Sequence, residues 1–220
     1  MVLLGVDLRS SKVRTSAVAV LDGQSQVVHI GPFETNNDLL KIVRSFRPEL
    51  IAIGAALTLP AGLCCLEASC PCEPEDPQKK GRQLELELSR LGISSFFTAK
   101  RSIVRPLIYR GIKLNRKLLD WGYSVVEVYP YATKMMLFGE KMPPGNNGRA
   151  VAFMREQLPR LVQGLEPHID SLDRNACDAL VSAYTALLHC RKETDVLGDP
   201  NEGLLVLPKL LGGRLVGAAA

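Results

Sequence analysis

Aromatic residues are scarce in this chain: they make up 5% of its 220 residues, and only one of them is tryptophan. Proteins that bind single-stranded nucleic acids usually stack bases on several aromatic side chains, so a platform of that kind is disfavoured. No run approaches the ~20 apolar residues of a membrane helix. Because residues 1–7 lack a basic region followed by a cleavable apolar segment, we expect no signal peptide, no membrane association and a cytoplasmic location.

The sequence also lacks internal repeats, low-complexity tracts and any recognisable interdomain linker. Its length suits one large domain. A hydrophobic content of 46% with 23% charged residues is ordinary for a globular protein. We therefore expect a single domain over residues 1–211, with a loop rich in cysteine and proline at 60–81. The small, apolar segment 212–220 is predicted to be a flexible tail.

Positive charge is concentrated in the middle of the chain. The formal net charge is +4, but the segment from Lys79 to Lys134 contains twelve basic and only four acidic residues. That segment alone carries +8, and the remainder carries −4. Such a block is a candidate surface for a phosphate backbone. On charge alone, a solvated helix face explains it equally well.

The N-terminal part of the sequence predicts a sheet. Three short apolar segments are separated by polar turns, and Asp22-Gly23 is a typical hairpin signal. A stretch with helical periodicity follows, Pro48 stops it, and another buried strand comes next. A strand, a helix and a strand after a meander imply a mixed sheet with helices packed on it. The predicted strands cover residues 3–8, 15–21, 26–30 and 49–54, and the helix covers 37–46.

The remainder of the chain predicts helices around one more strand. Residues 60–81 contain several prolines and read as a loop. Helical periodicity resumes afterwards, with Gly92 as a C-terminal cap of the first helix and a kink near Pro159 in a later one. Pro130 closes the predicted strand. The helices are expected over 82–91, 103–119, 149–165 and 172–190, and the strand over 124–128.

Three carboxylates stand where this pattern places strand ends or a helix face: Asp7, Glu127 and Asp178. Metal-assisted phosphodiester cleavage needs hard oxygen ligands around Mg²⁺ or Mn²⁺. An α/β sheet can bring distant carboxylates together at one edge of its strands. Taken singly, each residue also has a structural explanation: Asp7 as a turn cap, Glu127 on the outer face of its strand, and Asp178 as a polar position on a half-buried helix.

Several segments resemble a known family. The start Leu4-Gly5-Val6-Asp7, the stretch VVEVYPYATKMMLFG (125–139) and the later NACDALVSAYTA (175–186) resemble an uncharacterised family of predicted nucleases with a ribonuclease-H-like fold. The similarity spans nearly the whole chain, including 57–60, 81–92 and 185–189. It extends more distantly to Holliday-junction resolvases. The resemblance implies a ribonuclease-H-like α/β fold, in which an antiparallel three-stranded meander continues into parallel strands.

The resemblance assigns roles to the acidic residues and also shows two departures. Asp7 matches the first metal ligand, Glu127 the glutamate of the late strand, and Asp178 the acid on the C-terminal helix. The family usually has Ile-Asp-Ala-Pro where this chain has Ile-Gly-Ala-Ala, so Gly54 stands in place of a carboxylate. Asn175 likewise stands where relatives often carry aspartate. Losing anionic ligands should lower the affinity for metal.

Basic residues are placed near the predicted site by the same resemblance. Their side chains are candidates for phosphate contacts or for neutralising negative charge that develops during a reaction. The candidates for nucleic-acid contact, to DNA or RNA, are Arg82, Lys100, Arg101, Arg105 and Lys134.

The proline-rich loop holds Cys64, Cys65, Cys70 and Cys72. Their spacing only approximates the usual zinc patterns, in which two to four residues separate paired ligands. Zn²⁺, disulfides and a reduced, reactive loop therefore all remain open, although a cytosolic setting disfavours lasting disulfides. Of the three histidines, His29 and His168 show no ligand spacing, and His189 falls in the last turn of a predicted helix.

Three functions fit these observations. The first is a nuclease that depends on Mg²⁺ or Mn²⁺ and cleaves structured nucleic acid; a homodimer presenting two sites would suit a branched substrate. The second is a catalytically degraded nucleic-acid-binding module of the same fold, which Gly54 and Asn175 favour. The third is a phosphotransferase of the sugar-kinase and actin type. Those proteins need a second nucleotide-binding domain with a glycine-rich adenosine loop, and this chain shows neither.

Overall fold

Seven strands form one mixed sheet in the computed structural model, which describes residues 1–10, 15–144 and 148–209. The strand order is β3-β2-β1-β4-β5-β7-β6. Strands β1, β4, β5 and β7 run parallel to one another, whereas β2 is antiparallel to β1 and to β3, and β6 to β7. The strands are β1 (Val2–Asp7), β2 (Ser16–Asp22), β3 (Val27–Phe33), β4 (Leu50–Ile53), β5 (Val125–Val128), β6 (Thr194–Asp199) and β7 (Gly203–Pro208).

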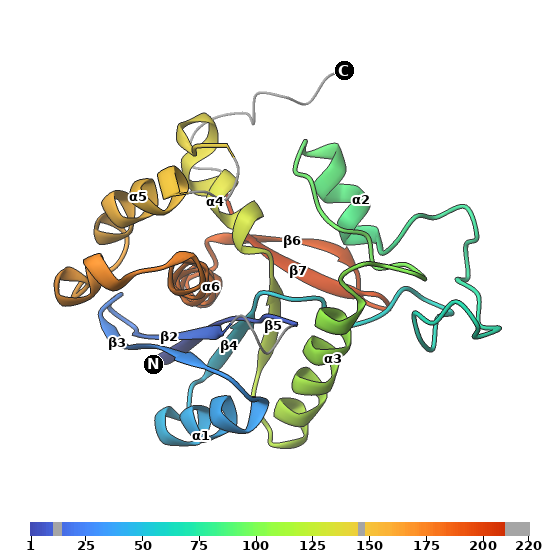
Figure 1. The fold of residues 1–220 in the computed structure, drawn as a ribbon, viewed down its shortest axis with the longest axis horizontal. Coiled ribbons are helices and arrows are strands. Elements are labelled where there is room, and N and C mark those ends of the chain that lie inside the picture. Colours follow the sequence, from blue (N-terminus) through green and yellow to red (C-terminus); the bar gives the residue numbers. More distant parts are fainter. Residues whose placement is uncertain (11–14, 145–147, 210–220) are drawn as a thin grey trace.

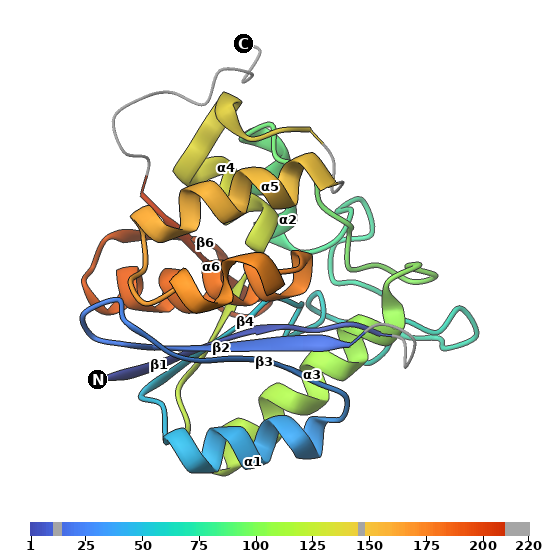
Figure 2. The same ribbon diagram turned by 60° about the vertical axis from the view of Figure 1, so that its left-hand side comes forward.

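Helices cover both faces of the sheet, as Figures 1 and 2 show. Helices α1 and α3 pack on one face, where they bury the even-numbered apolar residues of β1. Helix α6 lies on the other face, and α4 and α5 lie over α6 (Figure 2). The α-helices are α1 (Asn36–Phe46), α2 (Gln83–Arg90), α3 (Arg105–Asp120), α4 (Pro130–Phe138), α5 (Gly148–Gln157) and α6 (Arg174–Cys190). Three short 3-10 helices cover Gly139–Lys141, Leu158–Arg160 and Glu166–Ser171.

The predicted fold class is confirmed as a mixed α/β sheet with helices packed on it, in which a three-stranded antiparallel meander is followed by parallel strands. Strand β1 lies inside the sheet and is covered by helices on both faces. Its nearly continuous apolar run is typical of a strand that is buried on both sides. No helix within the described residues has both the length and the apolar character required to cross a membrane. The predicted tail at 212–220 lies outside the described residues.

Some element predictions were wrong. The strand predicted before Pro130 is present, but the helix α4 that begins at Pro130 was not predicted; proline suits this position because it lacks an N–H that the first helical turn would leave unpaired anyway. The helix expected over 149–165 ends at Gln157 and gives way to a 3-10 turn that contains Pro159. The hairpin of β6 and β7 was not predicted.

Gly5 in β1 lets α6 approach the sheet closely. A Cβ atom at this position would lie 2.1 Å from the backbone nitrogen of Ala183 and 2.2 Å from the carbonyl oxygen of Ala179. Both atoms belong to the backbone of α6, so no side-chain rotation relieves the overlap. This contact fixes the distance between the end of β1 and the residues of α6 that face it.

We expect Gly5→Ala to destabilise the protein by about 3 kcal/mol or more, because the helix must move away from the sheet. The measurement is urea denaturation followed by circular dichroism. Gly148→Ala is the matched control: a Cβ there meets nothing within 4 Å, and it should change the free energy of unfolding little. Equal effects of the two substitutions would contradict the close packing of α6.

Candidate active site

Two of the three predicted carboxylates come together at the carboxyl end of β1. Asp7 is the last residue of β1, and Asp178 lies in the second turn of α6, which packs against that strand. Each residue is only 4% exposed. One atom joins them: Arg9 Nη2 lies 2.9 Å from Asp7 Oδ2 and 3.6 Å from Asp178 Oδ2. The predicted convergence of the first strand and the last helix therefore holds for this pair.

Basic side chains surround the two carboxylates. Lys134, on α4, is buried, and its Nζ donates a 2.7 Å hydrogen bond to Asp178 Oδ1. Arg174 lies one helical turn before Asp178, with its Nε 3.6 Å from Asp178 Oδ2. Together with Arg9, the cluster holds three cationic and two anionic groups. It is therefore more positive than a site built from carboxylates alone.

Asn175 orients Arg9. Its side-chain carbonyl Oδ1 accepts hydrogen bonds from Arg9 Nε at 3.0 Å and Nη2 at 2.5 Å, and its Nδ2 donates to the carbonyl of Thr15 at 2.9 Å. An amide supplies both the acceptor and the donor that this arrangement uses. Asn175 thus fixes a guanidinium beside Asp7.

The surroundings of Asp7 disfavour the ionised form of its carboxyl group. Burial, and after it the charge of Asp178, raise its pKa from 3.8 to about 7, against the opposing effects of Arg9, Arg174 and Lys134. Among the described residues, its Oδ2 is buried without a hydrogen-bond partner, because Arg9 stands at ion-pair distance without hydrogen-bond alignment. A buried carboxylate oxygen in this condition is a strong acceptor for a proton or a cation.

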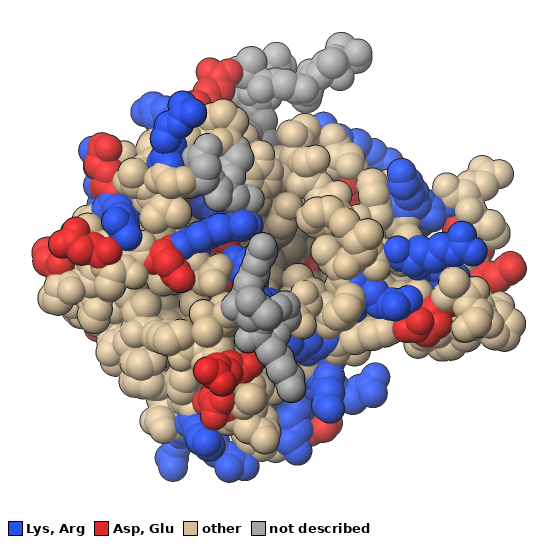
Figure 3. All heavy atoms as spheres, in the orientation of Figure 1, with Lys and Arg blue, Asp and Glu red and all other residues tan. Residues whose placement is uncertain are grey.

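The pair opens into a cleft of about 730 Å³. Its lining combines the charged cluster with aromatic and aliphatic side chains from the loop before α3 and the start of α4. Figure 3 shows a hollow near the middle of this face, with basic side chains beside it and more of them to the right, over the loop after β4 and the start of α3. Polar and aromatic residues of the lining include Asp7, Arg9, Tyr131, Lys134, Arg174 and Asp178.

Glu127 does not join this cluster, because it points to the opposite face of the sheet. In β5 it is paired with Ile53 of β4, whose side chain packs in the core under α1 and α3. Its neighbour Val128 packs instead with the residues of α6. Since side chains alternate along a strand, Val128 rather than Glu127 shares the face of Asp7. Within the described residues, the three predicted acids do not form a cluster of ligand atoms.

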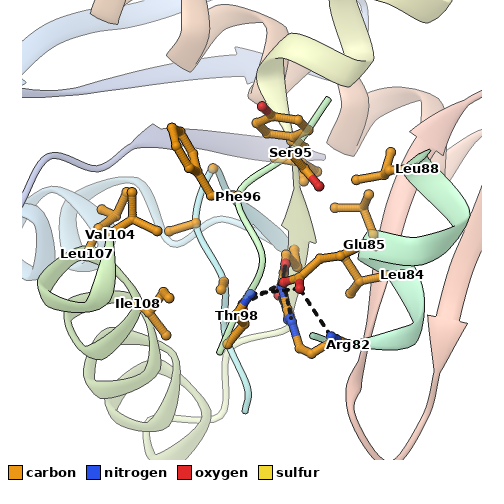
Figure 4. Close-up of a pocket in the computed structure, with 17 residues that line it drawn as sticks. Arg82, Leu84, Glu85, Leu88, Ser95, Phe96, Thr98, Val104, Leu107 and Ile108 are labelled. Atoms are coloured by element: carbon orange, nitrogen blue, oxygen red, sulfur yellow. Dashed lines mark hydrogen bonds and ion pairs between the residues drawn. The ribbon is translucent and has the colours of Figure 1, made fainter. Parts of the chain in front are cut away.

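Arg82 neutralises Glu127 on that face. Figure 4 shows Arg82 with Glu85 and Thr98, which belong to the same network. Its Nη1 and Nη2 donate to the two carboxylate oxygens of Glu127 at 2.8 and 2.7 Å, and its Nε donates to Glu85 at 3.0 Å. Glu85 also accepts from Thr98, and Glu127 accepts from the backbone N–H of Leu57 at 2.8 Å. The network satisfies both buried acids and joins α2, β5 and two loops.

The basic residues predicted to contact nucleic acid fall into two groups. Arg82 is 2% exposed and Lys134 3%, and both are engaged by carboxylates, so their expected contact with a phosphate backbone is not available from these positions. Lys100, Arg101 and Arg105 have access to solvent. Lys100 donates to the carbonyl of Cys70, and Arg105 pairs with Glu67 at 2.9 Å.

Gly54 lies beside the acidic pair, in line with Asp7 across the β1–β4 pairing. A Cβ atom there would come within 3.0 Å of the ring of Pro130 and 3.1 Å of the carbonyl of Val6. The position is thus tightly enclosed, and it supplies no ligand.

Sequence reasoning missed Arg9 and Arg174 as members of the site. Their closeness to the acids in sequence, two residues from Asp7 and four from Asp178, was the available signal.

The four loop cysteines lie apart from this cluster and close to one another. Their sulfur atoms fall within 4.8 Å of one another, and none forms a disulfide. Among the described residues this is the group of potential ligands that meets the geometric requirement for a metal ion.

The sheet order and the acidic pair at the end of β1 describe a mixed α/β protein with two buried carboxylates at the edge of its central strand. No family model matches the sequence, and no curated protein matches it. Among solved structures, the fold is similar to that of RuvC from Thermus thermophilus, with a TM-score of 0.48 and 14% identity over 87% of this chain and 97% of RuvC. Similarity at this level says nothing about which residues of this chain bind or react.

Proposed function

We propose that the protein is a divalent-metal-dependent nuclease whose active site is the cluster around Asp7 and Asp178. The observation on which this depends is the buried Asp7 carboxyl, whose Oδ2 has no hydrogen-bond partner among the described residues and which lies beside a second acid in a cleft of about 730 Å³. Burying two carboxylates side by side costs stability, and such costs are typical of sites that serve a ligand.

The donor set fits one hard cation better than two. Asp7 and Asp178 offer carboxylate oxygens, which Mg²⁺ and Mn²⁺ prefer, whereas Gly54 and Glu127 contribute no third acid. Mg²⁺ is commonly held by one or two carboxylates with water completing its shell. When bound, such an ion lowers the pKa of a water ligand and polarises a phosphoryl oxygen.

The basic residues of the cluster have separate roles in this proposal. Lys134 is buried and holds the Asp178 carboxylate in position through its hydrogen bond. The side chains of Arg9 and Arg174 are 17% and 39% exposed, so they are accessible from the cleft to a phosphate oxygen. Their positive charge would stabilise negative charge that develops on a phosphodiester. Arg101 and Arg105 provide further contacts to the backbone along the rim.

Incubation with branched, duplex and hybrid substrates tests this function. We expect cleavage in Mg²⁺ or Mn²⁺ and none in a chelator, with the strongest cleavage identifying the substrate class. Calorimetry with Mn²⁺ alone should show one bound ion per chain. Absence of both cleavage and Mn²⁺ binding would remove the proposal.

The positive excess of the cluster favours a second candidate, a nucleic-acid-binding module without catalysis. Three cations around two acids would hold a phosphate without any metal, and Asn175 keeps Arg9 in place for it. This alternative predicts nucleic-acid binding that is equal in chelator and in Mn²⁺ and weakens with salt. Substituting Arg9→Gln should then weaken nucleic-acid binding. A bound metal ion is required only by the nuclease, not by this alternative.

A further inference from the structure

The loop between β4 and α2 gathers four thiols within nine residues. This loop projects at the right-hand edge of Figure 1, away from the acidic cluster. Its cysteines are partly or fully accessible, all are free, and Cys64 Sγ lies 3.5 Å from Cys70 Sγ. The loop has little apolar core of its own: among residues 61–75 only Leu66 is buried. Something other than hydrophobic packing must therefore hold the sulfurs together.

We propose that Cys64, Cys65, Cys70 and Cys72 bind a structural Zn²⁺ ion through four thiolates. A tetrahedral site with Zn–S bonds of about 2.3 Å places its sulfurs about 3.8 Å apart. The sulfurs of this loop, all within 4.8 Å of one another, already approach that arrangement. Four protein ligands would close the coordination shell, which is typical of a structural rather than a catalytic zinc site.

The surroundings suit the charge of such a site. Zn²⁺ with four thiolates carries a net negative charge, and outer contacts commonly offset it. Lys100 Nζ donates a 2.6 Å hydrogen bond to the carbonyl of Cys70, which places an ammonium group against the loop. The separation of 3.5 Å between Cys64 Sγ and Cys70 Sγ is well beyond the ~2.05 Å of a disulfide, so the two thiols are free to act as ligands.

The ion would fix one wall of the cleft. The backbone N–H of Leu66 donates to the Tyr109 hydroxyl at 2.7 Å, and the carbonyl of Leu66 accepts from Arg101 at 3.3 Å. Glu67 pairs with Arg105 at 2.9 Å. These contacts tie the cysteine loop to residues 100–109, and Val104 and Leu107 in that segment line the cleft. Zinc therefore orders the basic rim without taking part in chemistry at Asp7.

Metal analysis of the full-length chain, purified under reducing conditions, tests the site. We expect one zinc ion per chain and, after replacement with Co²⁺, the absorption bands of a tetrahedral thiolate complex. Cys70→Ser and Cys72→Ser should lose the ion. Cys190→Ser is the control, because Cys190 is an exposed thiol at the end of α6, outside the loop. Loss of zinc from the control as well would contradict the assignment.

If the serine variants fail to fold, a second measurement on the wild-type chain still tests the proposal. Removing the ion from the wild-type chain with a chelator should accelerate hydrogen exchange in residues 63–73 and 100–109, while the exchange of β1 and α6 stays unchanged. Mn²⁺ binding at Asp7 and Asp178 should persist, so this result is independent of the proposed nuclease. A reduced chain that takes up no zinc, or intact mass showing two disulfides in the loop, would overturn the proposal.

Discussion

Replacing Arg82 with methionine is expected to lower the free energy of unfolding by about 3–5 kcal/mol, because it leaves buried carboxylates without their counter-charge. Arg82 contacts Glu127 through two hydrogen bonds and Glu85 through a third, and all three side chains are at most 6% exposed. Burial by itself lowers the pKa of Arg82, but the two carboxylates outweigh it and raise the value. Urea denaturation measures the loss.

Two further variants separate the charge from the bulk of the side chain. Arg90→Met, at the exposed C-terminal end of α2, the helix that Arg82 precedes, should change stability by less than about 0.5 kcal/mol. Adding Glu127→Gln to Arg82→Met should recover part of the loss, since one of the two uncompensated charges is then removed. If Arg82→Met proved as mild as Arg90→Met, the buried Glu127 carboxylate would not depend on Arg82 for its counter-charge.

The sheet was predictable where the chain gives local signals. An apolar run ending in Asp7, a hairpin signal at Asp22-Gly23 and a helix stopped by Pro48 lie close together in sequence and involve no distant register. Helix α6 was predictable for the same reason. The hairpin of β6 and β7 was missed although Asp199-Pro200-Asn201 is a typical turn sequence, because the strand before it, Thr194–Asp199, is half-exposed and weakly apolar.

The sequence around Glu127 could not predict on which face of the sheet its side chain lies. Strand β5 is four residues long and is covered on both sides, so its apolar residues do not alternate with exposed polar ones. In such a strand the direction of one side chain depends on the register with β4, which the sequence of β5 alone does not determine. The resemblance assigned Glu127 to the metal site from its position in a motif. The register instead places it among the residues under α3, where Arg82 neutralises it.

The pairing of Asp7 with Asp178 was predictable only as a topological consequence. The two residues are far apart in sequence, and their approach depends on Gly5, whose missing side chain lets α6 lie against β1. The closeness of Arg9 to Asp7 in sequence indicates that the two side chains can meet, but not that Arg9 bridges both carboxylates or that Asn175 holds it there. Interactions among three distant segments of this kind arise from packing.

Asp7→Asn is expected to reduce metal-dependent cleavage by about 100-fold or more, because a carboxylate that holds the ion contributes several kcal/mol to transition-state stabilisation. Asp195→Asn, an exposed acid on the edge strand β6, is the matched control and should cleave at the wild-type rate. The measurement is the single-turnover rate on the best substrate at saturating Mn²⁺. Undiminished cleavage by Asp7→Asn would remove Asp7 from the active site.

The raised pKa of Asp7 also predicts how metal binding depends on pH. With a pKa of about 7, Asp7 is largely protonated at pH 6 and ionised at pH 8. Because a metal ion binds the ionised form, Mn²⁺ affinity should rise about tenfold between these two values. Calorimetry in buffers of different ionisation enthalpy would also detect the released proton. In Asp7→Asn both the pH dependence and the proton release should disappear.

Asp7→Asn should raise the stability of the folded protein while it lowers cleavage. The folded-state pKa of Asp7 lies above its usual value of 3.8, so the folded protein binds this proton more tightly than the unfolded chain does. The stabilisation by that proton is complete below about pH 4 and is lost as the pH rises through about 7. Above that pH the ionised carboxylate is a cost that Asn removes, and Asp7→Asn should be more stable than wild type by about 1–3 kcal/mol. A variant that gains stability while losing cleavage cannot owe the loss to misfolding, so this combination would identify Asp7 as a residue kept for its chemistry.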